Sequence, residues 1–155
     1  MPDSPWLDER EQQAWRAFLR LHAQVSSRLQ RQLQRDCGLS LGDYGVLVNL
    51  SEAPDGRMRA FQLADALQWE KSRLSHQLRR MQARGLVDRE GCQSDRRGAF
   101  VVITEAGRRA IDAAAPGHVA EVRHAFLDAL SPADLDALTQ MADAANRIAA
   151  DGGAG

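Results

Sequence analysis

The chain has 155 residues, of which 44% are hydrophobic and only 5% aromatic. This length fits a single domain with enough apolar residues for a buried core, and the abundance of Ala and Leu favours helices over sheets. No apolar run approaches the roughly 20 residues that a membrane span needs, and residues 1–5 lack the basic and apolar regions of a signal peptide. Cys37 and Cys92 form no CxxC motif, which agrees with a reducing compartment. We therefore expect a cytoplasmic protein.

The net charge is only −1, but the charges are unevenly distributed. Residues 57–109 hold 12 Lys and Arg against six Asp and Glu, so this segment carries +6 and the remainder carries −7. A basic middle between acidic ends is typical of a chain in which one segment contacts nucleic acid. A well-solvated charged helix would show the same excess, so charge alone leaves that alternative open.

The first predicted helix covers residues 7–35. Its apolar side chains recur at steps of three and four and form one stripe: Trp15, Phe18, His22, Val25, Leu29 and Leu33. Gly38 is a plausible C-terminal stop. At about 1.5 Å per residue the helix would span about 40 Å, more than a small domain needs for its own core. This length suggests an intermolecular partner.

A helix-turn-helix unit follows. Ser40 and Asp43 resemble a capping box that starts the next helix, which should stop before the turn at residues 54–56. Two short helices are predicted at 60–67 and 71–84, the second ended by Gly85. Two short helices joined by three or four residues form this motif.

The second half of the chain is predicted to contain a hairpin and two more helices. Residues 86–89 and 99–103 have strand composition around a loop at 91–98. Thr104 can cap the next helix, which Pro116 and the following glycine should kink or break. A Ser-Pro pair at residues 131–132 marks the start of the last helix.

These elements predict a mainly α fold with a small β-hairpin wing, in a single domain over residues 1–155. A winged helix-turn-helix module at 40–106 would be flanked by dimerisation helices at 7–35 and 107–149. The flanking helices carry apolar stripes that one small module cannot bury, so we expect them to pair with a second copy of the chain.

The helix at 71–84 has the pattern of a major-groove reader. Its core stripe is Leu74, Leu78 and Met81. The N-terminal turns of such a helix approach base edges, so the base-contact candidates are Ser72, Arg73, Ser75 and His76. Arg79 and Arg80 lie farther along and are candidates for phosphate contacts. Solvent-exposed and phosphate-contacting residues look alike in sequence, so a purely solvated face is the alternative.

The loop between the strands is longer and more basic than a turn requires. Arg96 and Arg97 lie at its tip, where an arginine could enter a narrow minor groove. Asp95 could hold the neighbouring guanidinium through a charge-assisted bond. A flexible solvated loop is the alternative interpretation.

Nearly the whole chain resembles the MarR-type (multiple antibiotic resistance) regulators. The most specific residues are Leu63-Ala64, Leu74-Ser75, Leu78, Met81, Gly85-Leu86-Val87, Arg89, Asp95-Arg96-Arg97 and Ile103-Thr104-Glu105-Ala106-Gly107. The resemblance implies an obligate homodimer on double-stranded DNA with a pseudo-palindromic operator, in which Asp95 braces Arg97 in the minor groove. One departure is Ala60, where many relatives have Ser or Thr; the lost cap costs about 1 kcal/mol.

The resemblance also implies a small aromatic or phenolic ligand between the dimerisation helices and the DNA module. Four residues could line such a pocket: Trp15, His22, Tyr44 and Trp69. Aromatic side chains at helical spacing are more often ordinary core residues, and that alternative stays open.

The leading hypothesis is a homodimeric transcription regulator, a repressor released by a small molecule. One alternative is a thiol redox sensor acting through Cys37 or Cys92, although neither matches the position of the reactive cysteine in redox-sensing relatives. Another is a winged helix that binds protein. His118 and His124 have no metal-ligand spacing, and no catalytic motif or cofactor-binding loop is present, so neither an enzyme nor a metal or cofactor site is expected.

Overall fold

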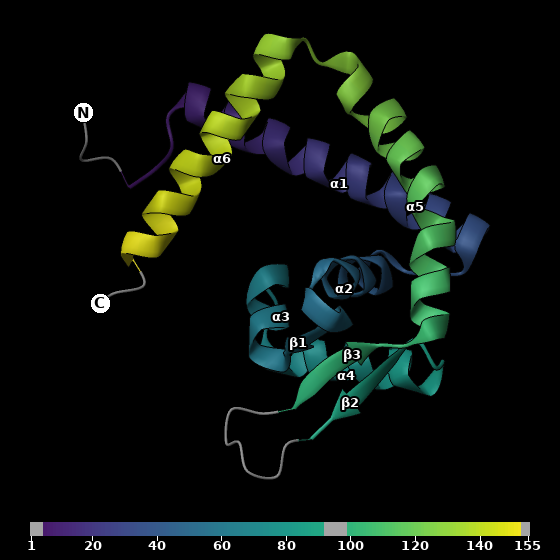
Figure 1. The fold of residues 1–155 in the computed structure, drawn as a ribbon. Coiled ribbons are helices and arrows are strands. Elements are labelled where there is room, and N and C mark those ends of the chain that lie inside the picture. Colours follow the sequence, from purple (N-terminus) through teal and green to yellow (C-terminus); the bar gives the residue numbers. More distant parts are fainter. Residues whose placement is uncertain (1–4, 92–98, 153–155) are drawn as a thin grey trace.

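The computed structural model describes residues 5–91 and 99–152. The chain follows the predicted plan of helices with a small sheet (Figure 1). Its elements are α1 (Glu9–Cys37), α2 (Leu41–Glu52), β1 (Arg57–Arg59), α3 (Ala60–Leu67), α4 (Lys71–Ala83), β2 (Val87–Glu90), β3 (Phe100–Ile103), α5 (Glu105–Ala125) and α6 (Pro132–Gly152). Single 3-10 turns lie at Pro54–Gly56 and Leu127–Ala129. The predicted fold class is confirmed.

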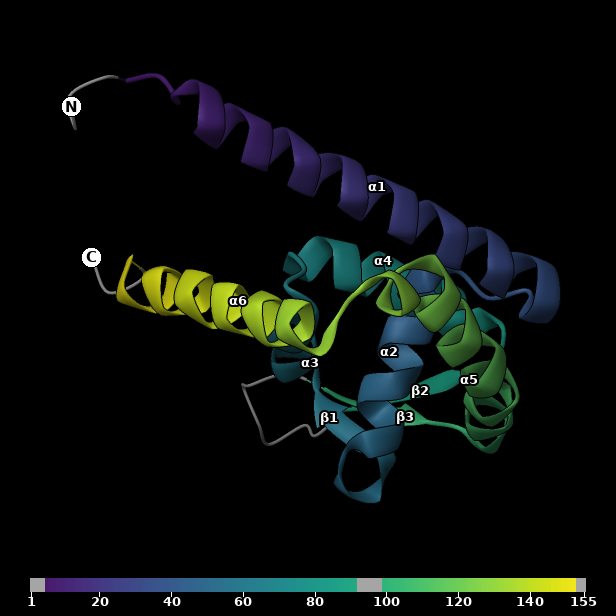
Figure 2. The same cartoon turned by 90° about the horizontal axis from the view of Figure 1, so that it is seen from above.

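The molecule has a globular module and a frame of long helices. Helices α2–α4 and the sheet form the module, while α1, α5 and α6 form the frame (Figure 1). The N-terminal half of α1 and the whole of α6 extend past the module on the same side (Figures 1 and 2). Most of the hydrophobic core lies in the module, and its fully buried side chains include Leu47, Leu50, Leu63, Leu78, Met81, Val87 and Val101. None of the described helices is apolar over a stretch long enough to cross a membrane.

Helix α1 begins and ends with strong local signals. Asp8 and Glu11 form a reciprocal capping box at its start. Gly38 ends it in the left-handed conformation with φ of 65°, as its sequence position predicts. Only the C-terminal third is buried, where Leu29 and Leu33 lie beneath α5.

The helix-turn-helix unit has the predicted boundaries. Helices α3 and α4 are joined by three residues, and Gln68 takes a left-handed φ of 55° that turns the chain between them. The predicted capping box of α2 is present, since Ser40 and Asp43 each bond the other's backbone N–H at 2.9 Å. Local side-chain chemistry therefore fixes where α2 starts.

The sheet has three antiparallel strands in the order β1-β3-β2, one more than the hairpin predicted from the sequence. In β1, Arg57 pairs with Val102 and Arg59 pairs with Phe100. Three residues with two arginines show no apolar alternation, and their pairing partners are more than 40 residues away. A pattern-based prediction therefore misses β1, because its stability comes from long-range pairing.

The sequence predicts that Pro116 kinks or breaks its helix, and the prediction of a break is wrong. Helix α5 runs through it from Glu105 to Ala125 and ends only at Phe126. Proline removes one backbone donor, but α5 packs against α1, and beyond this point Glu121 pairs with Arg28 of α1 at 2.9 Å. A Cβ on Gly117 would lie 3.2 Å from Nε2 of Gln32, so the two helices are in close contact here. Tertiary packing overrides the local preference.

The two remaining helix starts agree with their predicted caps. Thr104 Oγ1 accepts from the N–H of Gly107 at 3.0 Å and donates to the carbonyl of Gly85 at 2.6 Å. Before α6, Ser131 and Asp134 form another reciprocal box. The first of these caps also ties α5 to the end of the helix-turn-helix unit.

Candidate DNA-binding surface

Helix α4 has one buried face and one exposed face. Leu74, Leu78 and Met81 are buried against the core of the module, as the helical spacing predicts. Gln77 is buried with them and is only 6% exposed. The buried face therefore fixes the rotation of the helix about its own axis and points the other face outward.

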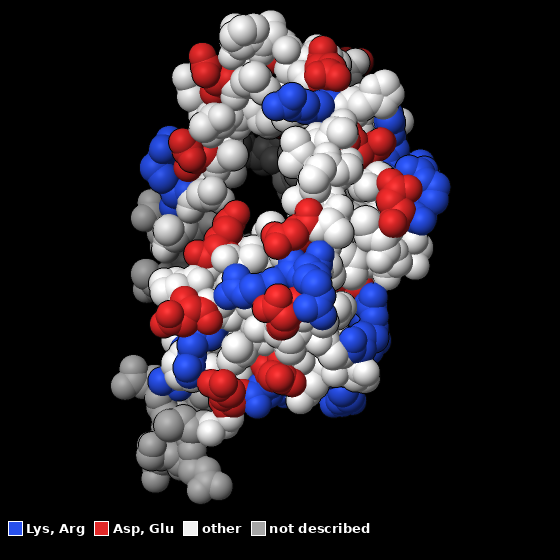
Figure 3. All heavy atoms as spheres, turned by 45° about the vertical axis from the view of Figure 1, so that its right-hand side comes forward, with Lys and Arg blue, Asp and Glu red and all other residues white. Residues whose placement is uncertain are grey.

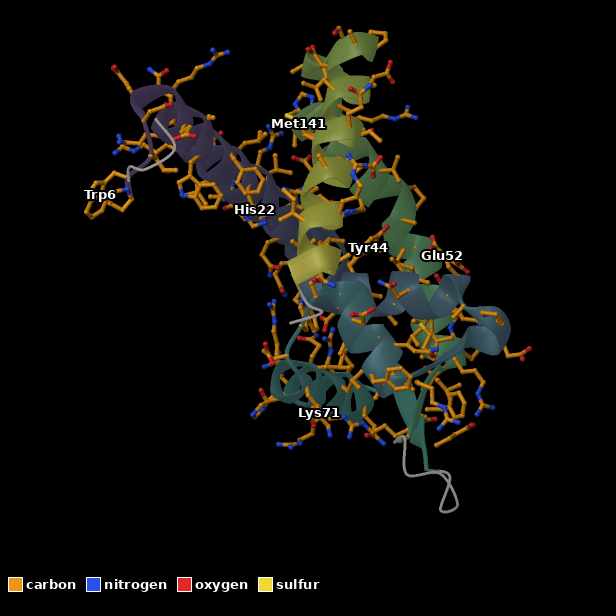
Figure 4. The ribbon with its side chains drawn as sticks, turned by 90° about the vertical axis from the view of Figure 1, so that its left-hand side faces the viewer. Trp6, His22, Tyr44, Glu52, Lys71 and Met141 are labelled. Carbon is orange, nitrogen blue, oxygen red and sulfur yellow. The ribbon has the colours of Figure 1, made fainter. Side chains whose placement is uncertain are left out.

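The outward face carries the predicted DNA contacts. Ser72, Arg73, His76 and Arg79 are all exposed, whereas Ser75 is half-buried. Lys71, the first residue of α4, lies at the end of the molecule opposite Met141 of α6 (Figure 4). A rigid helix whose exposed side is polar and basic is suited to entering a DNA groove.

Arg73 is held by an aromatic ring. Its guanidinium lies 4.3 Å from the ring centroid of Trp69, a cation–π distance. The far edge of the same indole packs on α2, because a Cβ on Gly42 would lie 3.2 Å from Cη2 of Trp69. The ring is therefore a fixed platform, and Arg73 starts from a restrained position at the first turn of α4.

Arg80 differs from its predicted neighbours in having a partner within the protein. Its Nη2 donates to Oε1 of Gln77 at 2.9 Å. The amide of Gln77 in turn donates to Oδ1 of Asp43 at 2.6 Å. Arg84, which caps α4, donates from Nη1 to Oδ2 of Asp43 at 2.7 Å. These four side chains form a network between α4 and the start of α2.

Sequence reasoning missed this network, although one signal was present. Gln77 lies on the same face of α4 as Leu74, Leu78 and Met81, so it is a polar residue on a core stripe. A buried polar side chain needs a hydrogen-bond partner. Asp43 was assigned only as part of a cap, and nothing local indicates that its carboxylate also reaches α4.

A second arginine cluster lies at the base of the wing. The guanidinium groups of Arg57 and Arg59 lie 4.0 and 4.1 Å from the ring centroid of Phe100. Arg57 also pairs with Glu90 on β2 at 3.3 Å. The two arginines belong to the strand that the sequence did not predict, and they place positive charge beside the hairpin.

The tip of the wing lies outside the described residues. Asp95, Arg96 and Arg97, together with Cys92, fall in the segment 92–98. Among the described residues, a hollow of about 590 Å³ opens between α3, α4 and the sheet, and Ser75, Trp69 and Arg89 are among its lining residues. The recognition helix and the base of the wing therefore border one concave surface.

The four residues proposed to line a ligand pocket lie in different surroundings. Trp15 is 53% exposed on α1 and stacks on Phe18 with 5.7 Å between centroids, and His22 continues this row. Trp69 lies beside the outward face of α4, with the guanidinium of Arg73 over its ring. Tyr44 alone is buried between the module and the frame (Figure 4).

Tyr44 of α2 stacks on His118 of α5, with their centroids 4.0 Å apart. Burial raises the pKa of Tyr44, and the nearby carboxylate of Glu52 adds to this effect. Burial also lowers the pKa of His118. Nδ1 of His118 and Oε1 of Gln32 are both buried and have no hydrogen-bond partner among the described residues. This junction therefore holds buried polar atoms between the module and the frame.

Of the two cysteines in the redox alternative, only Cys37 lies in the described part of the chain. Cys37 is half-buried and packs against the core at the end of α1. Within residues 5–91 and 99–152, no three His, Cys, Asp or Glu side chains gather as metal ligands would.

A two-helix unit with an outward polar helix, beside a three-stranded wing sheet, defines a winged helix-turn-helix DNA-binding protein. A model of the MarR family matches residues 38–98. AbsC, a MarR family regulator from Streptomyces coelicolor, is 45% identical with a TM-score of 0.83, over 96% of this chain and 97% of that chain. Sco3205 from the same organism, solved in complex with DNA, is 40% identical with a TM-score of 0.86, over 96% and 91%. The chain belongs to the MarR family of transcriptional regulators.

A third similar structure contains a small molecule. CouR from Rhodococcus jostii, solved bound to p-coumaroyl-CoA, is 26% identical with a TM-score of 0.70, over 86% of this chain and 89% of that chain. None of the curated proteins matches the chain. Family membership makes the chain a DNA-binding transcription regulator and not an enzyme.

Proposed function

We propose that the chain is a homodimeric, sequence-specific repressor that a small molecule releases from a pseudo-palindromic operator. The observation that carries the proposal is the outward face of α4, where Arg73 stands on the Trp69 ring at the first turn. Arginine matches guanine O6 and N7 in the major groove, while Ser72, Ser75 and His76 supply further contacts. Arg79 and Arg80 contact phosphates, and Arg97, braced by Asp95, enters the minor groove.

The dimer is supported by apolar side chains that the single chain leaves uncovered. Exposed large apolar residues gather on the frame helices and the segment before them: Trp6, Leu7, Trp15, Phe18, Leu19, Leu21, Val119, Leu135, Leu138, Met141 and Ile148. The space-filling view has an opening through the frame, where no part of the chain fills the space between helices (Figure 3). Monomeric proteins rarely expose so large an apolar surface. A second copy, with the same surface, covers it.

Release by a small molecule is supported by the junction of Tyr44 and His118. A ligand that changes the packing of α2 against α5 alters the placement of α4 relative to the frame. The unpartnered atoms on Gln32 and His118 offer an acceptor and a second polar contact to such a molecule. The similar structure of CouR, solved bound to p-coumaroyl-CoA, supports this part of the proposal.

The DNA-binding part of the proposal is tested with duplexes selected from a random library. We expect the protein to select a palindrome, with binding that weakens steeply as salt rises, because phosphate contacts release counterions. Arg73→Ala should relax the selected sequence at one position of each half-site. Selection of no sequence, or an affinity indifferent to salt, would refute the proposal.

The dimer is tested by placing a charge on the exposed apolar face of α6. Met141 is 62% exposed in the single chain, and Met141→Asp would bury a carboxylate in the proposed interface. We expect sedimentation to show a dissociation constant at least about tenfold higher. Gln140→Asp adds the same charge about 100° around α6, outside its apolar stripe, and is the matched control. Equal dissociation constants for the two variants would contradict the dimer.

A further inference from the structure

The buried carboxylate of Asp43 connects the start of α2 to the middle and the end of α4. Its Oδ2 accepts from the backbone N–H of Ser40 at 2.9 Å and from Nη1 of Arg84 at 2.7 Å. Its Oδ1 accepts from Nε2 of Gln77 at 2.6 Å. The Asp43 side chain is only 5% exposed. An anion so deeply buried is stable only with its donors in place, so it favours one geometry of the elements that supply them.

Arg84 extends this connection to α1. While Nη1 bonds Asp43, its Nη2 donates to the carbonyl of Gly38 at 2.9 Å. Gly38 caps the C-terminus of α1, and Arg84 caps the C-terminus of α4. One guanidinium therefore joins the end of a frame helix, the start of α2 and the end of the recognition helix. Its planar fork allows little change in the angle between them.

The contact between α2 and α4 is also tight. A Cβ on Gly42 would lie 3.2 Å from Oε1 of Gln77 and 3.2 Å from Cη2 of Trp69. Glycine at position 42 therefore allows α2 to approach Gln77 of α4 and the Trp69 ring closely, and Arg80 further holds Oε1 of Gln77 from outside. Packing and hydrogen bonding therefore favour the same placement of α4 on α2.

We propose that Asp43 and Arg84 are positioning residues that set the distance between the two recognition helices of the dimer, and so the spacing of operator half-sites that the protein accepts. The inference rests on the proposed dimeric DNA binding. Neither side chain needs to touch DNA. Their role is to transmit the orientation of α1, a helix of the dimerisation frame, to α4. Loss of the joint frees each module to rotate, so operators of several spacings bind with similar affinity.

The test measures binding to a set of operators that differ only in the spacer between half-sites. One added base pair moves a half-site by about 3.4 Å and about 35° around the duplex. Wild-type protein should lose up to about 100-fold in affinity, because only one module then engages. For Arg84→Ala we expect roughly tenfold weaker binding to the best operator and only about a threefold loss on insertion. An isolated half-site should bind both proteins equally.

Two further variants separate positioning from folding. Arg84→Lys keeps the charge but loses the fork that reaches two acceptors, so it should also tolerate altered spacing. Arg109→Ala removes an arginine whose only described ion pair is with Glu105, one turn away in α5, and should keep the wild-type preference. A purely structural defect would lower the active fraction for every duplex alike and leave the spacing preference unchanged.

Exchanging the hydrogen-bond donor and acceptor between positions 43 and 77 should restore the spacing preference. Asp43→Asn places a new amide N–H₂ against the amide donor of Gln77 and removes the anion beside Arg84. Adding Gln77→Glu supplies a carboxylate that accepts from the new amide and from Arg80. We expect the single variant to lose spacing preference and the double variant to regain a substantial part of it.

The outcomes distinguish this inference from the function on which it rests. Failure of the wild-type protein to bind any duplex, or binding without dependence on spacing, would refute the dimeric operator complex. If Arg84→Ala and Asp43→Asn show the same dependence on spacing as the wild type, the positioning role is overturned and the dimeric operator complex is not.

Discussion

Replacing Trp69 tests whether a prepositioned arginine reads the operator. The guanidinium of Arg73 lies 4.3 Å from the Trp69 centroid, and an exposed contact of this kind contributes about 0.5–1 kcal/mol. If DNA binding uses this placement, Trp69→Leu should weaken operator affinity about two- to fivefold. Arg73→Ala removes the base contact itself, worth about 1–3 kcal/mol, and should weaken binding about 5- to 150-fold.

The decisive measurement is a double-mutant cycle followed by fluorescence anisotropy. Because Trp69 acts through Arg73, Trp69→Leu should have almost no further effect in the Arg73→Ala background. Trp69→Phe keeps an aromatic face and should retain most of the affinity. Trp69 also packs on Gly42, so the melting temperature of each variant is measured to separate a loss of stability from a loss of DNA affinity. Equal weakening by Trp69→Leu in both backgrounds would refute the platform role.

Three other predictions concern stability. Gly107→Ala should destabilise the protein by more than about 3 kcal/mol in urea unfolding, because the new Cβ would overlap the backbone carbonyl of Leu86; near-wild-type stability would show that the backbone relaxes. Thr104→Ala removes the cap of α5 and should cost about 1–2 kcal/mol by the same assay, whereas Thr104→Ser should cost little. Since burial lowers the pKa of His118, the unfolded chain binds the proton more readily, so stability should be highest above pH 7 and fall toward pH 5. His118→Phe should flatten that pH dependence, and an unchanged slope would assign it to other groups.

The helices and their ends were largely predictable because their signals are local. The Ser40–Asp43 box and the left-handed Gly38 are readable from three or four consecutive residues, and the structure has both. The outward face of α4 follows equally from helical spacing. These features depend on the chain's own periodicity and require no knowledge of its partners in space.

The missed features all depend on distant partners. Strand β1 exists because it pairs with β3, and α5 passes through Pro116 because α1 packs against it. The same applies to the site: Asp43 and Arg84 are 41 residues apart, and nothing in the sequence brings them together. Arg80 was predicted to face phosphate, and its bond to Gln77 shows that it also belongs to the internal network.

Helix α6 has a consequence for how the regulator behaves at cellular concentrations. Residues 132–150 are all exposed in the single chain, so this helix has little to stabilise it apart from its own backbone bonds and the Ser131 cap. In the proposed dimer, folding of α6 and assembly are one equilibrium, and we expect the melting temperature to rise with protein concentration. For such a dimer, a low cellular concentration would lower both the number of regulators and the fraction of them that is fully folded, so operator occupancy would respond more steeply to expression level.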